Sequence, residues 1–456
     1  MENLFFRVET LLSETLPFVL TLSSGIFLTI KCRWFQLRHP LIGLTYIFKS
    51  GGKEENSGTS TFQSVCTSLA ATVGTGNIGG VAGAVAIGGA GAVFWMWVSS
   101  FFGMCIKLCE ITLSVKYREK CGKKFTGGPM YYIRKGLGAG LAPLSTAFAA
   151  ITVAASFGTG NFMQINTVVN SIKEDKALHL ITGAAFALLV FVVLKGGASR
   201  VFSFTEKAIP AMSILYLLLS LGIIAVNYKS VPVAFVMIFK GAFNPSAVTG
   251  GAVGSVAAAM FTGAARGIYS NEAGLGTAGL AHASSENNDA VEEGLSGIFE
   301  VFADTVVICT ATALAILCSG VKVPYGMYVS SGIVIEAFKS VYGAAAILFM
   351  PLMLILFAFT SIIGWGYYGI QCWGYLFGGK FTIIYTVLFS AACIAGAFFG
   401  NGIIWRISAL MNGVMLIINL TAVLCLSGTA ADCVNKYDAR LKNEKKGSII
   451  NKKQSL

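Results

Sequence analysis

The sequence has few charged residues. Asp, Glu, Lys and Arg make up only 12% of its 456 residues, whereas 55% are hydrophobic and 53 residues are glycine. Soluble domains carry roughly twice that share of charge, about 25%. A water-soluble fold of this length could not hide so much apolar surface, so the composition requires lipid as the solvent. The sequence therefore predicts an all-α membrane protein.

The sequence also lacks the motifs of catalytic and metal centres. Its three histidines, His39, His179 and His282, fall in predicted loops or at span ends, and none belongs to an HExxH motif. No GxSxG motif is present, and the 11 cysteines show no CxxC or metal-ligand spacing. We expect solvated histidines and cysteines that act as small buried hydrophobes. An enzyme, a resident cofactor and a pore-loop ion channel are all disfavoured.

Long apolar runs are what the sequence has instead. Runs of about 20 apolar residues can cross a bilayer as helices. They occur at residues 14–33, 61–86, 90–115, 143–170, 177–194, 207–227, 248–272, 297–318, 345–370, 380–400 and 405–428. The first run is not a convincing signal peptide, because acidic residues precede it and a clear cleavage site is missing. The sequence thus predicts 11 transmembrane (TM) helices.

Loop charge predicts the orientation. If the N-terminus lies outside, most Lys and Arg residues fall in cytoplasmic loops and in the basic tail 429–456. This asymmetry is the positive-inside pattern of a cell (inner) membrane protein with a cytoplasmic C-terminus. The net charge of +12 then reflects membrane topology, and we expect lipid rather than nucleic acid as a partner.

Two predicted spans are interrupted near their middle or end. One contains GTGNIGG at 74–80, and the other runs into RGIYSNEAGLG at 266–276. Glycines can simply allow close helix packing, but packing does not require the polar residues Thr75, Asn77 and Ser270. Broken helices at mid-membrane expose amides and carbonyls that suit a ligand. We therefore interpret both segments as parts of a transport site.

The two breaks divide the chain into matching halves. Leaving out the first span, five spans come before the connector and five after it, and each half opens with a broken helix, as in an inverted repeat. The predicted segments are 1–60 (TM helix and basic cytoplasmic loop), 61–227 (first repeat), 228–247 (connector), 248–428 (second repeat) and 429–456 (basic cytoplasmic tail).

Several blocks carry a family resemblance. They are VGTGNIGGVAGAVAIGGAGAVFWMWV (73–98), KYRE (116–119), GGPMYYI (127–133), RGIYSNEAGLGTA (266–278) and FTSIIGWGYYG (359–369). The chain resembles the alanine or glycine:cation symporter family from about residue 60 to 428. The resemblance implies a sodium:alanine symporter with the leucine-transporter (LeuT) fold, a 5+5 inverted repeat after one extra N-terminal helix. It also implies import of a small neutral amino acid.

The predicted substrate site surrounds the breaks. Free amides at the first break would bind the substrate carboxylate at a half-helix N-terminus, and carbonyls beside the second break would accept from its ammonium group. The resemblance adds an amide from the fourth span. A tryptophan in the ninth span either limits substrate size or fills the packing. The predicted residues are Gly74, Thr75, Gly76, Asn77, Gln164, Ser270, Asn271 and Trp365.

The predicted ion site needs oxygen ligands, because sodium is a hard cation. The resemblance places the adjacent hydroxyls of Thr360 and Ser361 at a sodium site, with carbonyls of Ala70, Val73 and Phe357 as partners. Such hydroxyls often bond only to their own helix. The coupling ion, Na⁺, is the only inorganic partner expected.

Ionisable residues inside predicted spans are functional candidates. Lys107 and Glu110 lie three residues apart, which favours an ion pair. Asp304 either pairs with Arg266 or forms a gate, and Glu272 either gates or caps its helix. Proton coupling through Asp304 or Glu272 is the alternative to sodium coupling, and a glutamine- or serine-preferring transporter is the alternative to an alanine or glycine transporter.

The last span departs from the family pattern. Relatives commonly carry an acidic residue where this chain has Ala409 and a proline where it has Ile418. The missing acid puts in doubt any extracellular gate or charge pair that this helix supports.

Overall fold

The computed structural model describes residues 11–39, 42–49, 59–122, 124–172, 175–253, 255–327, 329, 331–399 and 401–454. Within these ranges the chain is almost entirely helical. The sheet found there is a two-stranded antiparallel hairpin of β1 (Glu119–Cys121) and β2 (Lys124–Thr126), in which Glu119 pairs with Thr126. The all-α prediction is confirmed.

Helices occur at all the predicted spans. They are α2 (Leu16–Lys31), α5 (Thr61–Thr72), α6 (Val81–Gly88), α7 (Gly91–Lys116), α9 (Ala142–Phe157), α10 (Met163–Asn170), α11 (Lys176–Lys195), α12 (Gly197–Val226), α15 (Val256–Asn271), α17 (Ala290–Val301), α18 (Thr310–Cys318), α20 (Ala345–Phe377), α21 (Thr382–Gly396) and α22 (Asn401–Cys425). Among the described residues, seven helical stretches are long and apolar enough to cross a membrane, or eight if the bent pair α5 and α6 is one span. The helices α2 and α21 are apolar but shorter.

Three of these stretches contain π-helical turns. They are η3 (Gly76–Gly80) before α6, η5 (Gly158–Phe162) between α9 and α10, and η7 (Phe302–Cys309) between α17 and α18. A π turn disturbs the regular backbone hydrogen bonds of a helix and is frequent at functional sites. All three border the site described below.

Shorter elements join the spans. They are η1 (Leu11–Thr15), α3 (Phe35–Arg38), α4 (Ile42–Lys49), α8 (Pro129–Gly136), η4 (Ala139–Leu141), η6 (Tyr228–Ser230), α13 (Val231–Phe243), α14 (Pro245–Thr249), α16 (Ala278–His282) and α19 (Gly332–Tyr342). The predicted connector 228–247 is therefore largely helical. The helix at the predicted span 207–227 begins earlier, at Gly197, because an apolar run marks the part of a helix suited to lipid and not where backbone hydrogen bonding starts.

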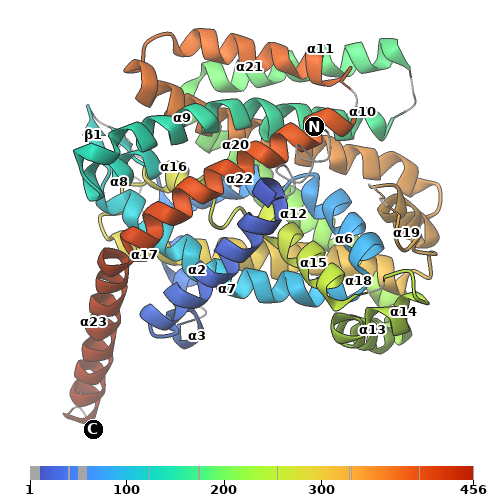
Figure 1. The fold of residues 1–456 in the computed structure, drawn as a ribbon, viewed down its shortest axis with the longest axis horizontal. Helices are drawn as coiled ribbons and strands as arrows, with labels where there is room; N and C mark the ends of the chain where they lie inside the picture. The colour runs from blue at the N-terminus through green and yellow to red at the C-terminus, as the bar shows by residue number, and fades with distance from the viewer. Residues whose placement is uncertain are drawn as a thin grey trace.

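The helix α7 lies at the centre of the packing. It contacts α2, α13, α15 and α17. The helices α11 and α21 lie side by side at one edge, and α23 (Ser427–Gln454) projects from the opposite end with the C-terminus (Figure 1). The predicted basic tail is thus a helix.

Candidate functional site

The first predicted break is a bend in the backbone. The axes of Thr61–Thr72 and Gly76–Gly88 differ by 54°. A β-carbon at Gly74 would collide with Ser361 Oγ on α20. Only glycine therefore lets α20 approach the bend this closely.

The amides at this bend already have partners. The Gly74 amide donates to Asn77 Oδ1 (2.9 Å), and the Thr75 amide points at Gln164 Oε1 (3.4 Å), which also accepts from Thr75 Oγ1 (2.8 Å). The amides of Gly74 and Thr75 are thus not free in this conformation, because the side-chain amide oxygens of Asn77 and Gln164 accept from them. Gln164 follows η5 and does lie at the first break.

The side chain of Asn77 connects the first break to the second. Its Nδ2 donates to Asp304 Oδ1 (2.7 Å) and Ser270 Oγ (3.1 Å), and Ser270 Oγ donates to Asp304 Oδ2 (2.6 Å). Thr305 Oγ1 donates to the same oxygen (2.9 Å). All four side chains are buried. Asp304 therefore holds both broken helices through hydrogen bonds, and the salt bridges of the described residues do not pair it with Arg266, whose side chain is half-buried.

The second break follows Asn271. Glu272 has φ +55°, and Gly274 and Gly276 have φ +98° and +78°, so left-handed residues separate α15 from α16. Glu272 is the C-cap residue of α15, where its amide donates to the Ile268 carbonyl (2.9 Å), and its carboxylate accepts from Thr277 Oγ1 (2.6 Å) across the break. The Asn271 carbonyl accepts from Lys107 Nζ (3.0 Å), so this predicted acceptor for a substrate ammonium is occupied.

Lys107 does not pair with Glu110 as its spacing predicted. Its ammonium forms an ion pair with Glu300 Oε2 (3.0 Å), while Glu110 accepts from the side chain of Asn419 on α22. Tertiary packing brings a carboxylate from α17 against α7, and this contact outweighs a weak i,i+3 attraction.

Glu300 extends this ion pair into a buried chain of charges. Its other oxygen faces His282 Nε2 (2.6 Å), and His282 Nδ1 faces Glu293 Oε1 (2.7 Å). Lys107, His282, Glu293 and Glu300 are each at most 1% exposed. The prediction of a solvated His282 is therefore wrong, because α16 packs its last residue against α17.

The geometry around His282 requires an extra proton. A neutral imidazole has one N–H, but both ring nitrogens face carboxylate oxygens, so a second proton lies on the ring or on one carboxylate. With that proton the four groups have no net charge, which keeps the cost of burying them low. The remaining oxygen of Glu293 accepts from Thr61 on α5 (2.7 Å) and from Ser285 (2.9 Å).

The predicted sodium residues lie on two packed helices. Ala70, Val73, Phe357, Thr360 and Ser361 are all buried. Gly364 brings α20 against Ala71 of α5, with a built β-carbon 2.7 Å from the Ala71 amide nitrogen. Thr360 Oγ1 donates to carbonyls of its own helix, those of Leu356 and Phe357 (both 3.0 Å), whereas the buried hydroxyl of Ser361 has no hydrogen-bond partner among the residues that the structure describes.

Trp365 is buried one turn beyond Ser361. Its Cβ lies where a side chain at Gly160 would be, so α20 packs directly on η5. The sequence contained a signal for this contact: GTGN occurs twice, at 74–77, which leads into the π turn η3, and at 158–161, which lies in the π turn η5. The repetition was a signal for η5, whose Thr159 carbonyl accepts from Gln164 Nε2 (3.3 Å).

Three comparisons place this architecture among known proteins. The model of the sodium:alanine symporter family matches residues 1–451. The chain is 37% identical to "Sodium/alanine symporter AgcS" of Methanococcus maripaludis (94% of this chain, 96% of the relative) and 33% identical to "Probable sodium/glutamine symporter GlnT" of Bacillus subtilis (97% and 92%). The crystal structure of MhsT in complex with L-phenylalanine, a LeuT-fold protein, matches with a TM-score of 0.57 at 13% identity (81% of this chain, 90% of that chain), which supports the fold.

Proposed function

This chain belongs to the sodium:alanine symporter family, and from that premise we propose that it imports a small neutral amino acid, alanine or glycine, together with sodium by alternating access. As a family member with several long apolar helices, it is a multi-pass membrane protein. The identities of the substrate and of the coupling ion are what we propose beyond family membership.

One observation carries the proposal: the two helix breaks meet through Asn77, Ser270 and Asp304. Both elements that must move in alternating access thus share one buried carboxylate. A ligand that changes these hydrogen bonds changes both helices at once.

Substrate binding follows from the side chains that now cover the amides. The substrate carboxylate displaces the oxygens of Asn77 and Gln164 and accepts from the amides of Gly74, Thr75 and Gly76. Because Lys107 occupies the Asn271 carbonyl, the negative charge for the ammonium comes from Asp304 or Glu272 instead. Trp365 limits the space for a substrate side chain, which favours alanine and glycine.

Sodium binds beside Ser361. A buried hydroxyl without a partner leaves its oxygen available to a hard cation. Thr360 and the carbonyls of Ala70, Val73 and Phe357 complete the proposed ligand set. Because these ligands are dipoles without a full charge, the ion is held weakly enough to be released.

The architecture proposed with this function has 11 TM helices in a 5+5 repeat, 61–227 and 248–428, after one N-terminal helix. The 1–60 and 429–456 segments then lie outside the repeats, and the 228–247 connector joins the two repeats. Loop charge favours an outside N-terminus and a cytoplasmic C-terminus in the cell membrane.

Proton coupling is a second candidate, favoured by the proton that His282 shares with Glu293 and Glu300 and by the buried carboxylates of Asp304 and Glu272. Glutamine or serine as substrate is the other alternative. Glutamine is included in the experiment below because the B. subtilis relative is named a probable sodium/glutamine symporter.

Uptake by proteoliposomes distinguishes these candidates. Purified protein is assayed for counterflow with alanine, glycine, serine and glutamine, in sodium or potassium at fixed pH, and then with an imposed proton gradient. We expect alanine and glycine uptake that requires sodium. Uptake that is unchanged in potassium but collapses without a proton gradient would replace sodium with the proton as the coupling ion.

A further inference from the structure

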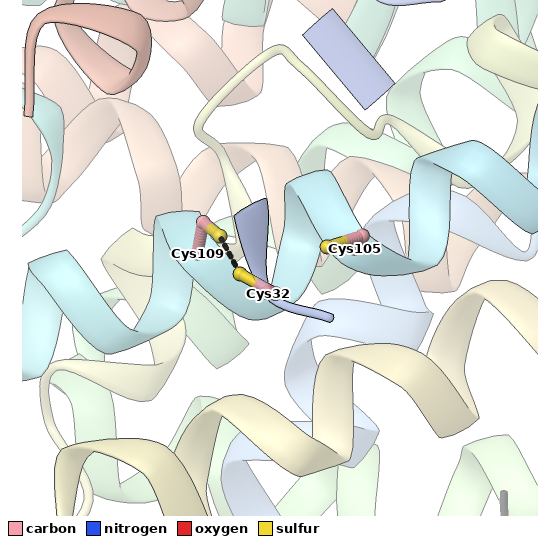
Figure 2. A group of neighbouring side chains, drawn as sticks. All are labelled: Cys32, Cys105 and Cys109. Carbon is pink, nitrogen blue, oxygen red and sulfur yellow. Dashed lines mark hydrogen bonds between the residues drawn. The ribbon is translucent and has the colours of Figure 1, made fainter. Parts of the chain in front are cut away.

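Three cysteine sulfurs converge between the N-terminal helix and the central helix. Cys32 follows the last residue of α2, whereas Cys105 and Cys109 lie one turn apart on α7 (Figure 2). All three side chains are buried. Their sulfurs lie within 4.8 Å of one another, and Sγ of Cys32 is 3.9 Å from Sγ of Cys109.

These distances fit three ligands of one metal ion. Three thiolate sulfurs about 2.3 Å from a shared ion lie roughly 4 Å apart in a trigonal plane, given ordinary metal–sulfur bond lengths. The same distances are too long for a disulfide, whose sulfurs are about 2.05 Å apart. The separation of the Cys32 and Cys109 sulfurs is thus the one expected for two thiolates on one ion, and the Cys105 sulfur lies within 4.8 Å of both.

Two pairs of facing residues, spaced equally along the two helices, bring the sulfurs together. On α2, Gly25 lets the backbone approach α7, since a β-carbon there would lie 2.6 Å from Cβ of Phe102. Cys32 follows Gly25 by two turns, and Cys109 follows Phe102 by two turns. The close contact between Gly25 and Phe102 thus places Cys32 opposite Cys109 two turns further along both helices.

The backbone after Cys32 is strained. Arg33 and Trp34 are consecutive non-glycine residues with φ of +56° and +57°. Left-handed conformations are unfavourable for residues that carry a β-carbon. This turn ends α2 and directs Cys32 toward α7. Arg33 and Trp34 are exposed, so the chain reaches the surface at the residue that follows the buried Cys32.

A second layer of polar groups faces the sulfurs. Thr29 lies beside Cys105, and its hydroxyl already accepts from Gln36 Nε2 (2.8 Å), which leaves its hydrogen free to point at the sulfur. Such outer hydrogen bonds orient and tune metal–thiolate ligands. Lys31 supplies a positive charge near Cys32 that offsets part of the charge of bound thiolates.

We propose that Cys32, Cys105 and Cys109 form a trigonal thiolate site for a soft monovalent metal ion, Cu(I). Soft thiolates select such ions, and zinc in structural sites has four ligands, one more than this cluster provides. Each ligating thiol releases its proton on binding, and the copper stays Cu(I) throughout. The bound ion fastens α2 to α7, independently of the transport function proposed above.

The test uses the purified full-length protein under anaerobic reducing conditions. Cu(I) is titrated against bathocuproine disulfonate, a competing chelator, and X-ray absorption counts the ligands. We expect one Cu(I) per chain, three sulfur ligands at about 2.3 Å, and a higher unfolding temperature with the ion bound.

Single variants then identify the ligands. Cys32→Ser, Cys105→Ser and Cys109→Ser should each weaken Cu(I) binding at least a hundredfold, whereas Cys318→Ser, a buried cysteine outside the cluster, should not change it. The sulfur count is made on the unmodified protein, so it does not depend on whether the variants fold. No stoichiometric binding, a two-sulfur or four-ligand site, a Cys32–Cys109 disulfide in the reduced preparation, or unchanged binding by Cys32→Ser would each overturn the proposal.

Discussion

Single residues set how closely the helices at the site can approach. Gly74 is the clearest case, because Ser361 Oγ occupies the position of its missing β-carbon. Gly80 lies in η3, the π turn that follows the bend, and a β-carbon built on it would have no neighbour within 4 Å. Comparing substitutions at the two glycines therefore distinguishes the need for close contact with Ser361 from a need for a flexible backbone.

We expect Gly74→Ala to lower alanine uptake at least tenfold, because a methyl group there pushes α20 away from the bend. Gly80→Ala is the matched control and should keep uptake within about twofold, since it adds the same methyl group without a neighbour. Initial rates of proteoliposome uptake, normalised to folded protein, give the comparison. Equal losses in both variants would mean that flexibility of the segment, and not the contact with Ser361, is what matters.

The unpartnered hydroxyl of Ser361 leads to a second prediction. Thr360→Ala/Ser361→Ala should raise the sodium concentration for half-maximal uptake at least tenfold, which corresponds to about 1.4 kcal/mol. Uptake at saturating sodium should recover most of the rate if the loss concerns only the ion. A sodium dependence identical to that of the unmodified protein would place the ion elsewhere.

Helices and their contacts show what sequence could and could not predict. The breaks and the helical segments were predictable because glycine clusters and apolar runs act locally, whereas Gln164 was assigned to the site only through the family resemblance. The partners of Lys107 and His282 were not, because they depend on how α16 and α17 pack on α7. Spacing along one helix suggested Glu110, but a carboxylate from another helix lies nearer.

The protein should be less destabilised by removal of both charges of the Lys107–Glu300 ion pair than by removal of the Lys107 charge alone. Lys107→Met leaves the buried chain with one negative charge in excess, and an uncompensated buried charge typically costs about 3 to 5 kcal/mol. Lys107→Met/Glu300→Gln restores the charge balance, so its unfolding temperature in detergent should fall less than that of the single variant. Lys339→Met removes an exposed partner of Glu336 and serves as the control with little effect. A double variant less stable than the single one would contradict this view.

The helix α23 is held by an acidic residue. Burial opposes the charge of Asp438, but hydrogen bonds from Lys442, Arg38 and His39 outweigh it and hold the pKa of this carboxyl well below its usual value. A depressed pKa in the folded state stabilises the contact above the unfolded pKa of about 3.9 and loses this effect as pH falls through the folded pKa.

Hydrogen exchange in α23 should follow that titration. In the unmodified protein we expect protection around Asp438 to persist from pH 7 to 5, after correction for the intrinsic exchange rate, and to fall only below about pH 4. Asp438→Asn should lose protection already at pH 7, whereas Asp432→Asn, an exposed residue of the same helix, should not. Protection that is lost between pH 7 and 5 would indicate a different titrating group.

For the whole molecule, alternating access requires the two broken helices to separate at one end while they stay close at the other. In this structure they are closed at the end where α5 begins. The Glu286 amide donates to the Thr59 carbonyl (2.9 Å), and the hydroxyls of Thr61 and Ser285 lie 3.5 Å apart, both near Glu293. With the proposed orientation, this closed end faces the cytoplasm.

A reversible bond across this end should therefore stop transport without abolishing binding. We expect oxidation of Thr61→Cys/Ser285→Cys to reduce uptake at least tenfold, because the cytoplasmic path can no longer open, while sodium-dependent alanine binding to the detergent-solubilised protein persists. Dithiothreitol should restore uptake, and the two single-cysteine variants, oxidised in the same way, control for the native cysteines. If the cross-linked protein transports normally, these residues do not separate during the cycle, and the movement that admits substrate to the cytoplasm must occur between other elements.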